Sequence, residues 1–185
     1  MSLPHILLGL LHRPASGYDV KKEFDGSLRN FWRAELSQIY PQLAKLQKRG
    51  LLVSTAVESD KGPPRNVYEI TRAGRDEFRR WLEQGPSVGK ERIAYLAQTY
   101  FLARLDDDDA RIAFLGRLKA YSEDWLAALR GIEAAWSADD PRYPDDLPDD
   151  DFYPQLTLDF GMRRVAVTVD WCRDSIRRID ARRIR

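Results

Sequence analysis

Three stretches within the first fifty residues carry apolar side chains at helical spacing. Apolar residues three and four positions apart lie on one face of an α-helix, so each stretch predicts an amphipathic helix. The first covers residues 3–12, the second residues 16–28 and the third residues 36–49. The sequence therefore predicts three short helices, each with one buried face, at the start of the chain.

The boundaries of these helices are marked by residues of suitable chemistry. Ser16 precedes Asp19 by three positions, a spacing at which the two side chains cap the start of the second helix. Proline is tolerated only near the first turn, so Pro41 requires the third helix to start around Leu36 or to bend. Gly50 is typical of the residue that follows the end of a helix.

A β-hairpin and a fourth helix are predicted next. Residues 51–58 are rich in β-branched and apolar side chains, and residues 66–70 provide a return strand. Residues 59–64, Ser-Asp-Lys-Gly-Pro-Pro, have the chemistry of a turn. Thr71 is placed to cap the helix that follows.

A Gly-Pro-Ser segment at residues 85–87 separates this part of the chain from a second, helical part. We therefore expect two domains, residues 1–85 and residues 86–185. The second contains three helical patterns, of which the middle one opens with four consecutive aspartates at residues 106–109. The fold class that follows is mainly α with a small β-hairpin.

The last helix carries two apolar seams. The first repeats with alternating spacings of four and three residues for about three heptads, as in a coiled coil. One short two-helix hairpin is too small to bury both seams, so we expect a homodimer held largely by this helix. The first seam, which is the expected dimer interface, consists of Leu158, Met162, Val165, Val169, Cys172, Ile176 and Ile179. The second seam consists of Leu156, Phe160, Val167 and Trp171.

Charge is unevenly distributed between the two parts. Residues 1–85 hold 14 Lys and Arg against 10 Asp and Glu, whereas residues 86–185 hold 16 against 19. The first part is therefore the better partner for an anion such as nucleic acid. The longest apolar run, residues 6–11, is far shorter than the roughly 18 residues of a membrane helix. We expect a cytoplasmic protein that makes no membrane contact.

The order helix, helix, helix, hairpin, helix is typical of a winged helix-turn-helix domain, which places one helix in the major groove of DNA. The apolar face of the third helix leaves polar side chains on its outer side, where they can bond base edges or phosphates. These are Ser37, Gln38, Tyr40, Gln42 and Lys45. Polar outer faces are common on surface helices, so a winged-helix module that binds protein remains the alternative.

The sequence LSQIYPQLAKLQKRGL at residues 36–51 resembles the recognition-helix region of the PadR family, the phenolic-acid-response transcriptional regulators. SGYDV at residues 16–20 is similar to the start of the family's second helix, and residues 62–75 are similar to its wing and following helix. The resemblance covers residues 3–84. Residues 157–171 resemble, more loosely, the C-terminal helical domain of the larger members.

This resemblance implies a homodimeric DNA-binding regulator, usually a repressor relieved by a small molecule, and its two-fold symmetry implies a palindromic operator. Pro63 and Asn66 stand where the family commonly has basic residues, so we expect weak wing contacts. Trp32 is a candidate contact for a small aromatic or hydrophobic effector. The expected DNA contacts are Tyr18, Lys21, Ser37, Gln38, Tyr40, Gln42, Lys45, Lys61 and Arg65.

Other chemistry is poorly represented in the sequence. His5 and His12 lack a third ligand nearby, so we expect no metal site. Cys172 lies in an apolar seam, where packing is favoured over catalysis. The sequence contains no phosphate-binding glycine motif, nucleophile elbow or His-centred catalytic set. We therefore expect neither an enzyme nor a cofactor.

Overall fold

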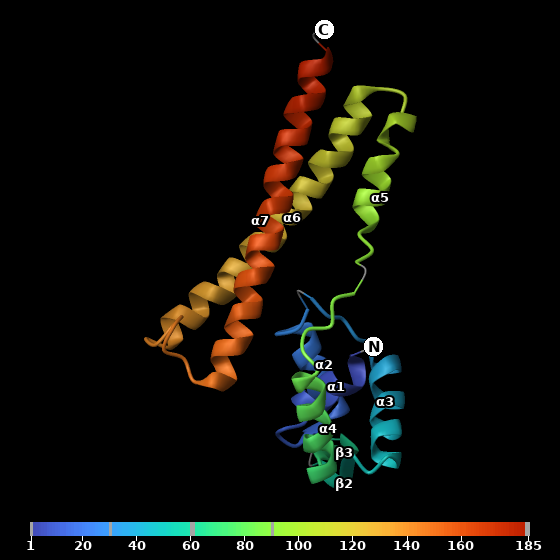
Figure 1. Cartoon of the computed structure of the whole chain (residues 1–185), viewed down its shortest axis with the longest axis vertical. Coiled ribbons are helices and arrows are strands. Elements are labelled where there is room, and N and C mark those ends of the chain that lie inside the picture. The colour runs from blue at the N-terminus through green and yellow to red at the C-terminus, as the bar shows by residue number, and fades with distance from the viewer. Residues whose placement is uncertain (1, 30, 60–61, 90, 184–185) are drawn as a thin grey trace. The chain divides into compact units, whose positions relative to one another are not determined.

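The structure is a computed structural model, in which the chain divides into two compact units, Met1–Gly89 and Lys90–Arg185. Figure 1 shows helices α1–α4 in the first unit and α5–α7 in the second. The first unit ends at Gly89, four residues beyond the boundary that the sequence predicts. The structure describes residues 2–29, 31–59, 62–89 and 91–183.

The first unit packs four helices around one apolar core and adds a small sheet. Its elements are α1 (Leu3–Leu10), β1 (Ala15–Ser16), α2 (Gly17–Asp25), α3 (Leu36–Lys48), β2 (Leu52–Ser59), β3 (Gly62–Ile70) and α4 (Arg72–Glu83). The largest fully buried side chains of this core include Leu7, Leu11, Phe24, Ile39, Leu43 and Leu46. The predicted order of three helices, hairpin and helix is confirmed.

The predicted starts of α2 and α3 are confirmed, whereas α1 ends at Leu10 and α2 at Asp25, two and three residues earlier than predicted. Ser16 Oγ accepts a hydrogen bond from the backbone N–H of Asp19 at 3.2 Å, and the Asp19 carboxylate accepts one from the Ser16 N–H at 3.0 Å. Helix α3 begins at Leu36 and contains Pro41. Gly50 follows the helix with a φ of +71°, a conformation that only glycine adopts without strain.

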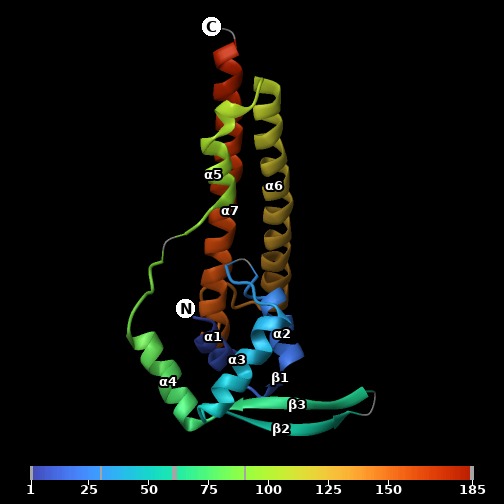
Figure 2. The same ribbon diagram turned by 90° about the vertical axis from the view of Figure 1, so that its right-hand side faces the viewer.

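The sheet has three antiparallel strands in the order β1-β3-β2 (Figure 2). Strands β2 and β3 pair from Leu52↔Ile70 to Val57↔Arg65, which confirms the hairpin. The return strand begins at Gly62, earlier than predicted. Strand β1 was not predicted, because two residues are too few to show the alternation that marks a strand.

The second unit is built around two long helices that lie side by side in both views (Figures 1 and 2). Asp107 caps α6 by accepting a hydrogen bond from the Ala110 N–H at 2.6 Å, so the aspartate run opens the helix as predicted. Carboxylates are favoured there because the start of a helix carries partial positive charge. The elements are α5 (Ala94–Tyr100), the 3₁₀ helix η1 (Leu102–Arg104), α6 (Asp108–Asp139) and α7 (Asp149–Arg183).

Three members of the first seam of α7, which is the predicted dimer interface, are buried within the second unit. Cys172 is fully buried, Leu158 and Val169 are buried, and the other members, Met162, Val165, Ile176 and Ile179, are half-buried. Helix α6 supplies its own buried residues to the same core: Leu115, Ser122, Leu126 and Leu129. The buried part of the first seam therefore faces α6, whereas Leu156, Phe160 and Val167 of the second seam remain exposed.

Candidate nucleic-acid interface

Helix α3 has one buried and one exposed face. Ile39, Leu43 and Leu46 are at most 1% exposed, so they hold the helix on the core. Ser37 and Lys45 lie on the opposite, exposed face, and no hydrogen bond or ion pair within the described residues occupies either side chain. Gln42 is half-buried at the edge between the two faces. The structure thus presents these three polar residues on one rigid helix.

Gln38 serves the helix itself. It occupies the third position of α3, where its side-chain oxygen accepts a hydrogen bond from the Glu35 N–H at 3.0 Å. Reading an adenine in a bidentate manner requires both the oxygen and the amino group of a glutamine. Because the hydrogen bond from Glu35 holds the side chain at the start of the helix, Gln38 caps α3 in the structure.

Two tyrosines lie where α2 and α3 meet. The Tyr40 ring packs against Gly17 so closely that a Cβ atom built on Gly17 would be 2.6 Å from the ring. Tyr40 therefore joins the two helices while about half of it remains exposed. Tyr18, the next residue of α2, is 68% exposed. Both predicted DNA contacts are thus exposed in the structure.

Lys21, a predicted phosphate contact, is paired with carboxylates of its own chain. Its ammonium group forms an ion pair with Asp25 and lies 3.5 Å from Glu35 Oε2, and its side chain is only 17% exposed. The hydrogen bond to Asp25 raises the pKa of Lys21. A phosphate would have to displace two carboxylates, so we leave Lys21 out of the proposed contacts.

The wing contributes Arg65, which is exposed on β3. Hydrogen bonds from Ser16 hold the pKa of Asp19 below its ordinary value, and the nearby positive charge of Arg65 adds to this effect. Arg65 therefore lies close to the start of α2. Lys61, the other basic residue predicted in the wing, lies outside the described residues.

Sequence reasoning missed a link between α3 and the wing. Gln47 donates a hydrogen bond from Nε2 to Ser54 Oγ at 2.9 Å, which joins the last turn of α3 to β2. The residues are seven positions apart and lie in different elements, so no periodic pattern reveals the contact. This bond helps to fix the angle between the helix and the hairpin.

The remaining candidates are explained by packing. The His5 ring stacks on Trp81 with ring centroids 5.0 Å apart, and within the described residues no three His, Cys, Asp or Glu side chains are grouped as metal ligands. Trp32 is half-buried against the core of the first unit. Burial raises the pKa of the Cys172 thiol, as expected for a packed cysteine.

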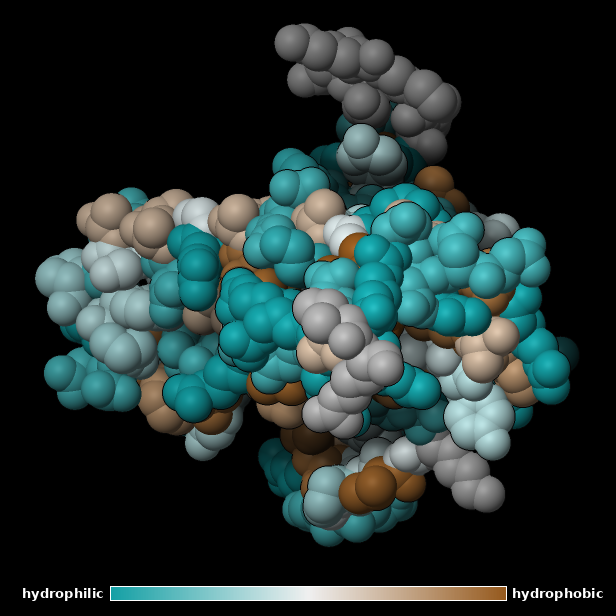
Figure 3. Space-filling model, turned by 90° about the horizontal axis from the view of Figure 1, so that it is seen from above, coloured by the Kyte–Doolittle hydropathy of each residue, from teal (hydrophilic) through white to brown (hydrophobic). Residues whose placement is uncertain are grey.

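The second unit leaves apolar side chains exposed on its helices. Phe160 and Val167 of α7 are 60% and 68% exposed, and Leu156 lies on the same seam. Helix α5 and its end expose three more: Leu96, Tyr100 and Phe101. In the view of Figure 3, hydrophobic patches stand among mainly hydrophilic residues. Among the helices described, none combines the length and apolar character needed to cross a membrane.

Comparison with known proteins agrees with both units. Residues 6–80 match the transcriptional regulator PadR-like family, and residues 91–180 match the virulence activator alpha C-terminal family. A probable transcriptional regulator of Mycobacterium tuberculosis, Rv1176c, is 29% identical over 92% of this chain and 94% of its own. The negative transcriptional regulator PadR of Bacillus subtilis is 28% identical over 96% and 97%.

Solved structures match over the whole length. Bacillus subtilis PadR in complex with operator DNA has a TM-score of 0.84 at 24% identity, covering 97% of this chain and 99% of that one. The same protein in complex with p-coumaric acid has a TM-score of 0.80 at 26% identity, with the same coverage. The Vibrio cholerae virulence activator AphA has a TM-score of 0.75 at 29% identity, again with 97% and 99% covered. The chain therefore belongs, through residues 6–80, to the PadR-like family of transcriptional regulators, and residues 91–180 form a C-terminal helical domain of the virulence activator alpha type.

Proposed function

We propose that the chain binds a palindromic operator as a homodimer and represses transcription until a small effector relieves the repression. The observation that carries the DNA-binding site is the outer face of α3, where Ser37, Gln42 and Lys45 are presented by a helix whose other face is fully buried. A rigid helix with polar side chains is what base readout in the major groove requires. Arg65 and Lys61 contact the flanking phosphates from the wing.

The homodimer follows from the exposed apolar residues of the second unit. With its first seam used against α6, α7 still exposes Leu156, Phe160 and Val167 on one side. Large exposed apolar patches are rare on monomers and mark interaction sites. In a two-fold symmetric dimer, this face of one copy packs against the same face of the other. The same symmetry places two recognition helices on DNA.

Repression and effector response are supported by the relatives. The Bacillus subtilis relative is a negative transcriptional regulator, and its structure has been solved with p-coumaric acid as well as with operator DNA. The Vibrio cholerae relative is an activator. We favour repression because the negative regulator PadR is similar over 96% of this chain, with 28% identity. An apolar outer face on α3 would favour the protein-binding alternative, whereas exposed Ser37 and Lys45 make part of this face polar.

A reporter experiment tests the proposed function. Promoter fragments of the source genome that bind the wild-type chain are first isolated in a pull-down. Each fragment then drives a reporter in cells that express the chain. Repression is expected, with loss of repression in the Ser37→Ala/Gln42→Ala/Lys45→Ala variant. The control is Arg79→Ala, which removes one exposed positive charge from α4. Increased transcription with the wild-type chain would contradict repression, and an equally active triple variant would contradict the site.

A further inference from the structure

The second unit contains a partly open cavity of about 910 Å³, lined by residues of α5, η1, α6 and α7. Small-molecule sites in proteins have volumes of about 300–1,000 Å³. The cavity lies within a single unit, between the start of α6 and the end of α7. None of the functions derived above uses it.

One side of the cavity is aliphatic. Leu102 of η1, Leu115 of α6 and Ile179 of α7 line it together with Ala103. Leu115 is 1% exposed, so this side is continuous with the core. Among the described residues that line the cavity, no aromatic ring is present. The lining therefore suits a saturated chain better than a flat ring.

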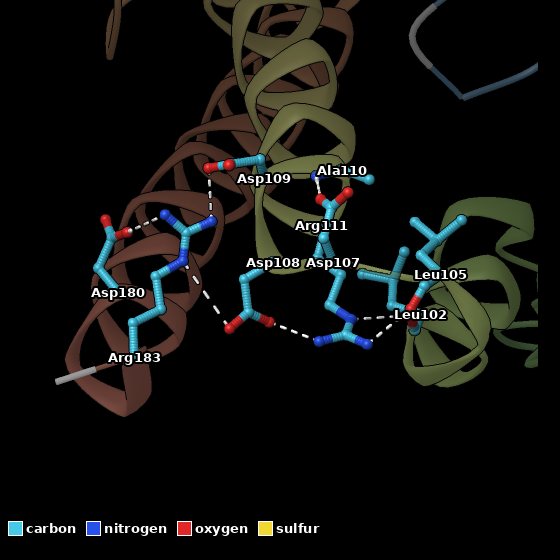
Figure 4. A network of polar contacts seen from close by, with 9 residues as sticks. All are labelled: Leu102, Leu105, Asp107, Asp108, Asp109, Ala110, Arg111, Asp180 and Arg183. Atoms are coloured by element: carbon cyan, nitrogen blue, oxygen red, sulfur yellow. Dashed lines mark hydrogen bonds and ion pairs between the residues drawn. The ribbon is translucent and has the colours of Figure 1, made fainter. Parts of the chain in front are cut away.

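Two arginines at this end of the unit are held by protein groups (Figure 4). Arg111 donates to the carbonyl oxygens of Leu102 at 3.2 Å and Leu105 at 2.6 Å, and also to Asp108. Arg183 pairs with Asp109 and lies near Asp108. The Arg111 bonds hold η1 and the residue after it against α6, and Arg183 joins α7 to α6. They also compensate the charge of Asp108, the carboxylate in the cavity lining.

Two further arginines line the cavity and are not held in this way. Arg178 and Arg182 lie one turn apart on α7, and neither forms an ion pair with any residue in the described part of the chain. Like charges four positions apart on a helix destabilise it, so an anion bound between them would be stabilised by both. Ser175, one turn earlier, adds a hydroxyl group to the same wall.

We propose that this cavity binds a small organic anion composed of a carboxylate on an aliphatic body. The carboxylate bridges the guanidinium groups of Arg178 and Arg182, and the aliphatic body packs against Leu102, Leu115 and Ile179. Binding of this anion is a property separate from operator binding, and it can be measured in the absence of DNA.

Isothermal titration of the full-length chain with octanoate tests the proposal. Octan-1-ol has the same body without the charge, and acetate has the charge without the body. We expect saturable binding of octanoate and at least tenfold weaker binding of the other two. Arg178→Gln/Arg182→Gln should weaken octanoate binding at least tenfold. Arg177→Gln is the matched control, because Arg177 is exposed on the same helix and paired with Asp174.

A second variant separates the cavity from its charges. Ala103→Phe fills the aliphatic side while leaving both arginines in place, and should also abolish binding. Any of three results would overturn the proposal: no binding of octanoate to the wild-type chain, unchanged binding to both the Arg178→Gln/Arg182→Gln and Ala103→Phe variants, or octanoate binding no tighter than that of octan-1-ol. If the wild-type chain binds octanoate but no operator DNA, this site is supported and the proposed function is overturned. If it binds operator DNA but no octanoate, the proposed function is supported and this site is overturned.

Discussion

Gly74 lies in the first turn of α4 at a position that has no room for a side chain. A Cβ atom built there would be 2.2 Å from the backbone oxygen of Leu51 and 2.7 Å from Ile70 Cγ1. Thr71 accepts a hydrogen bond from the Gly74 N–H at 3.0 Å and donates one to the Gly50 carbonyl at 2.8 Å. The glycine therefore allows α4 to pack directly on the turn that ends α3.

We expect Gly74→Ala to destabilise the chain by about 1–3 kcal/mol, the usual cost of overpacking, because backbone atoms must move. Gly116→Ala is the control. Nothing lies within 4 Å of a Cβ atom at Gly116, so alanine should stabilise α6 by roughly 0.5–1 kcal/mol. Urea unfolding of both variants measures the difference. An unchanged midpoint for Gly74→Ala would contradict the tight packing of α4.

Arg65 differs from the residues of α3 in the kind of contact that it makes. With Lys45, Lys61 and Arg65 each meeting a phosphate in two subunits, the log–log salt slope of operator binding should be near −5. Arg65→Ala should flatten it by about 2 and weaken all operator variants alike. Asp19 keeps its two hydrogen bonds from Ser16 in this variant, so the fold is retained. Titrations at several salt concentrations provide the slopes. A changed base preference with an unchanged slope would contradict the phosphate contact.

At the scale of single elements, the capping box of α2 makes stability depend on pH. Hydrogen bonds from Ser16 lower the pKa of Asp19 from its ordinary value of 3.8, and Arg65 contributes. A lowered folded-state pKa adds stability that is complete above the unfolded pKa and is lost as the pH falls through the folded one. We therefore expect Asp19→Asn to be less stable than wild type at pH 7, by about 1 kcal/mol as for other caps.

The difference between wild type and Asp19→Asn should narrow as the pH falls below about 4, because the wild-type carboxylate then takes up its proton. Urea unfolding between pH 2 and pH 7 measures both proteins under the same conditions. The exposed Asp170→Asn on α7 is a control whose carboxylate has no capping role. A constant difference across this range would contradict the role of the ionised carboxylate.

Local chemistry explains which features of the elements are predictable from sequence. Ser16, Gly50 and Thr71 act on backbone groups a few residues away, so their roles are visible in the sequence and confirmed in the structure. The burial of Lys21 depends partly on Glu35, which comes from another segment. Its other partner, Asp25, lies four positions later, a helical spacing at which an ion pair is predictable from the sequence.

The two seams of α7 show where sequence patterns stop being informative. A periodic apolar pattern indicates that a helix face is buried, but not whether the same chain or a second copy covers it. The first seam has the regular coiled-coil spacing, and it packs on α6. The second seam, which is less regular, remains exposed at Phe160 and Val167. Which surface covers each face depends on tertiary packing, and the periodicity of apolar residues in one sequence does not reveal it.

At the scale of the whole molecule, the exposed seam predicts how the dimer can be broken. Phe160→Glu/Val167→Glu places charges in an apolar interface, so we expect a folded monomer at micromolar concentration. Val169→Glu is the contrasting variant, because Val169 is buried within the unit and its charge should unfold the helices instead. Sedimentation gives the mass, and circular dichroism gives the helix content. A wild-type monomer, or a seam variant that remains dimeric, would contradict this interface.

The central claim is that a two-fold symmetric dimer reads DNA through the outer face of α3. Selection of bound sequences from random double-stranded DNA by the full-length chain tests it most directly, with Gln42→Ala selected in parallel. We predict a palindromic consensus whose half-sites are about one helical turn apart, or a multiple of it. Gln42→Ala should lose about 1–3 kcal/mol of preference at one symmetric pair of positions and keep the rest. The claim would be contradicted if the wild-type chain enriched no particular sequence, or if it enriched a consensus without two-fold symmetry.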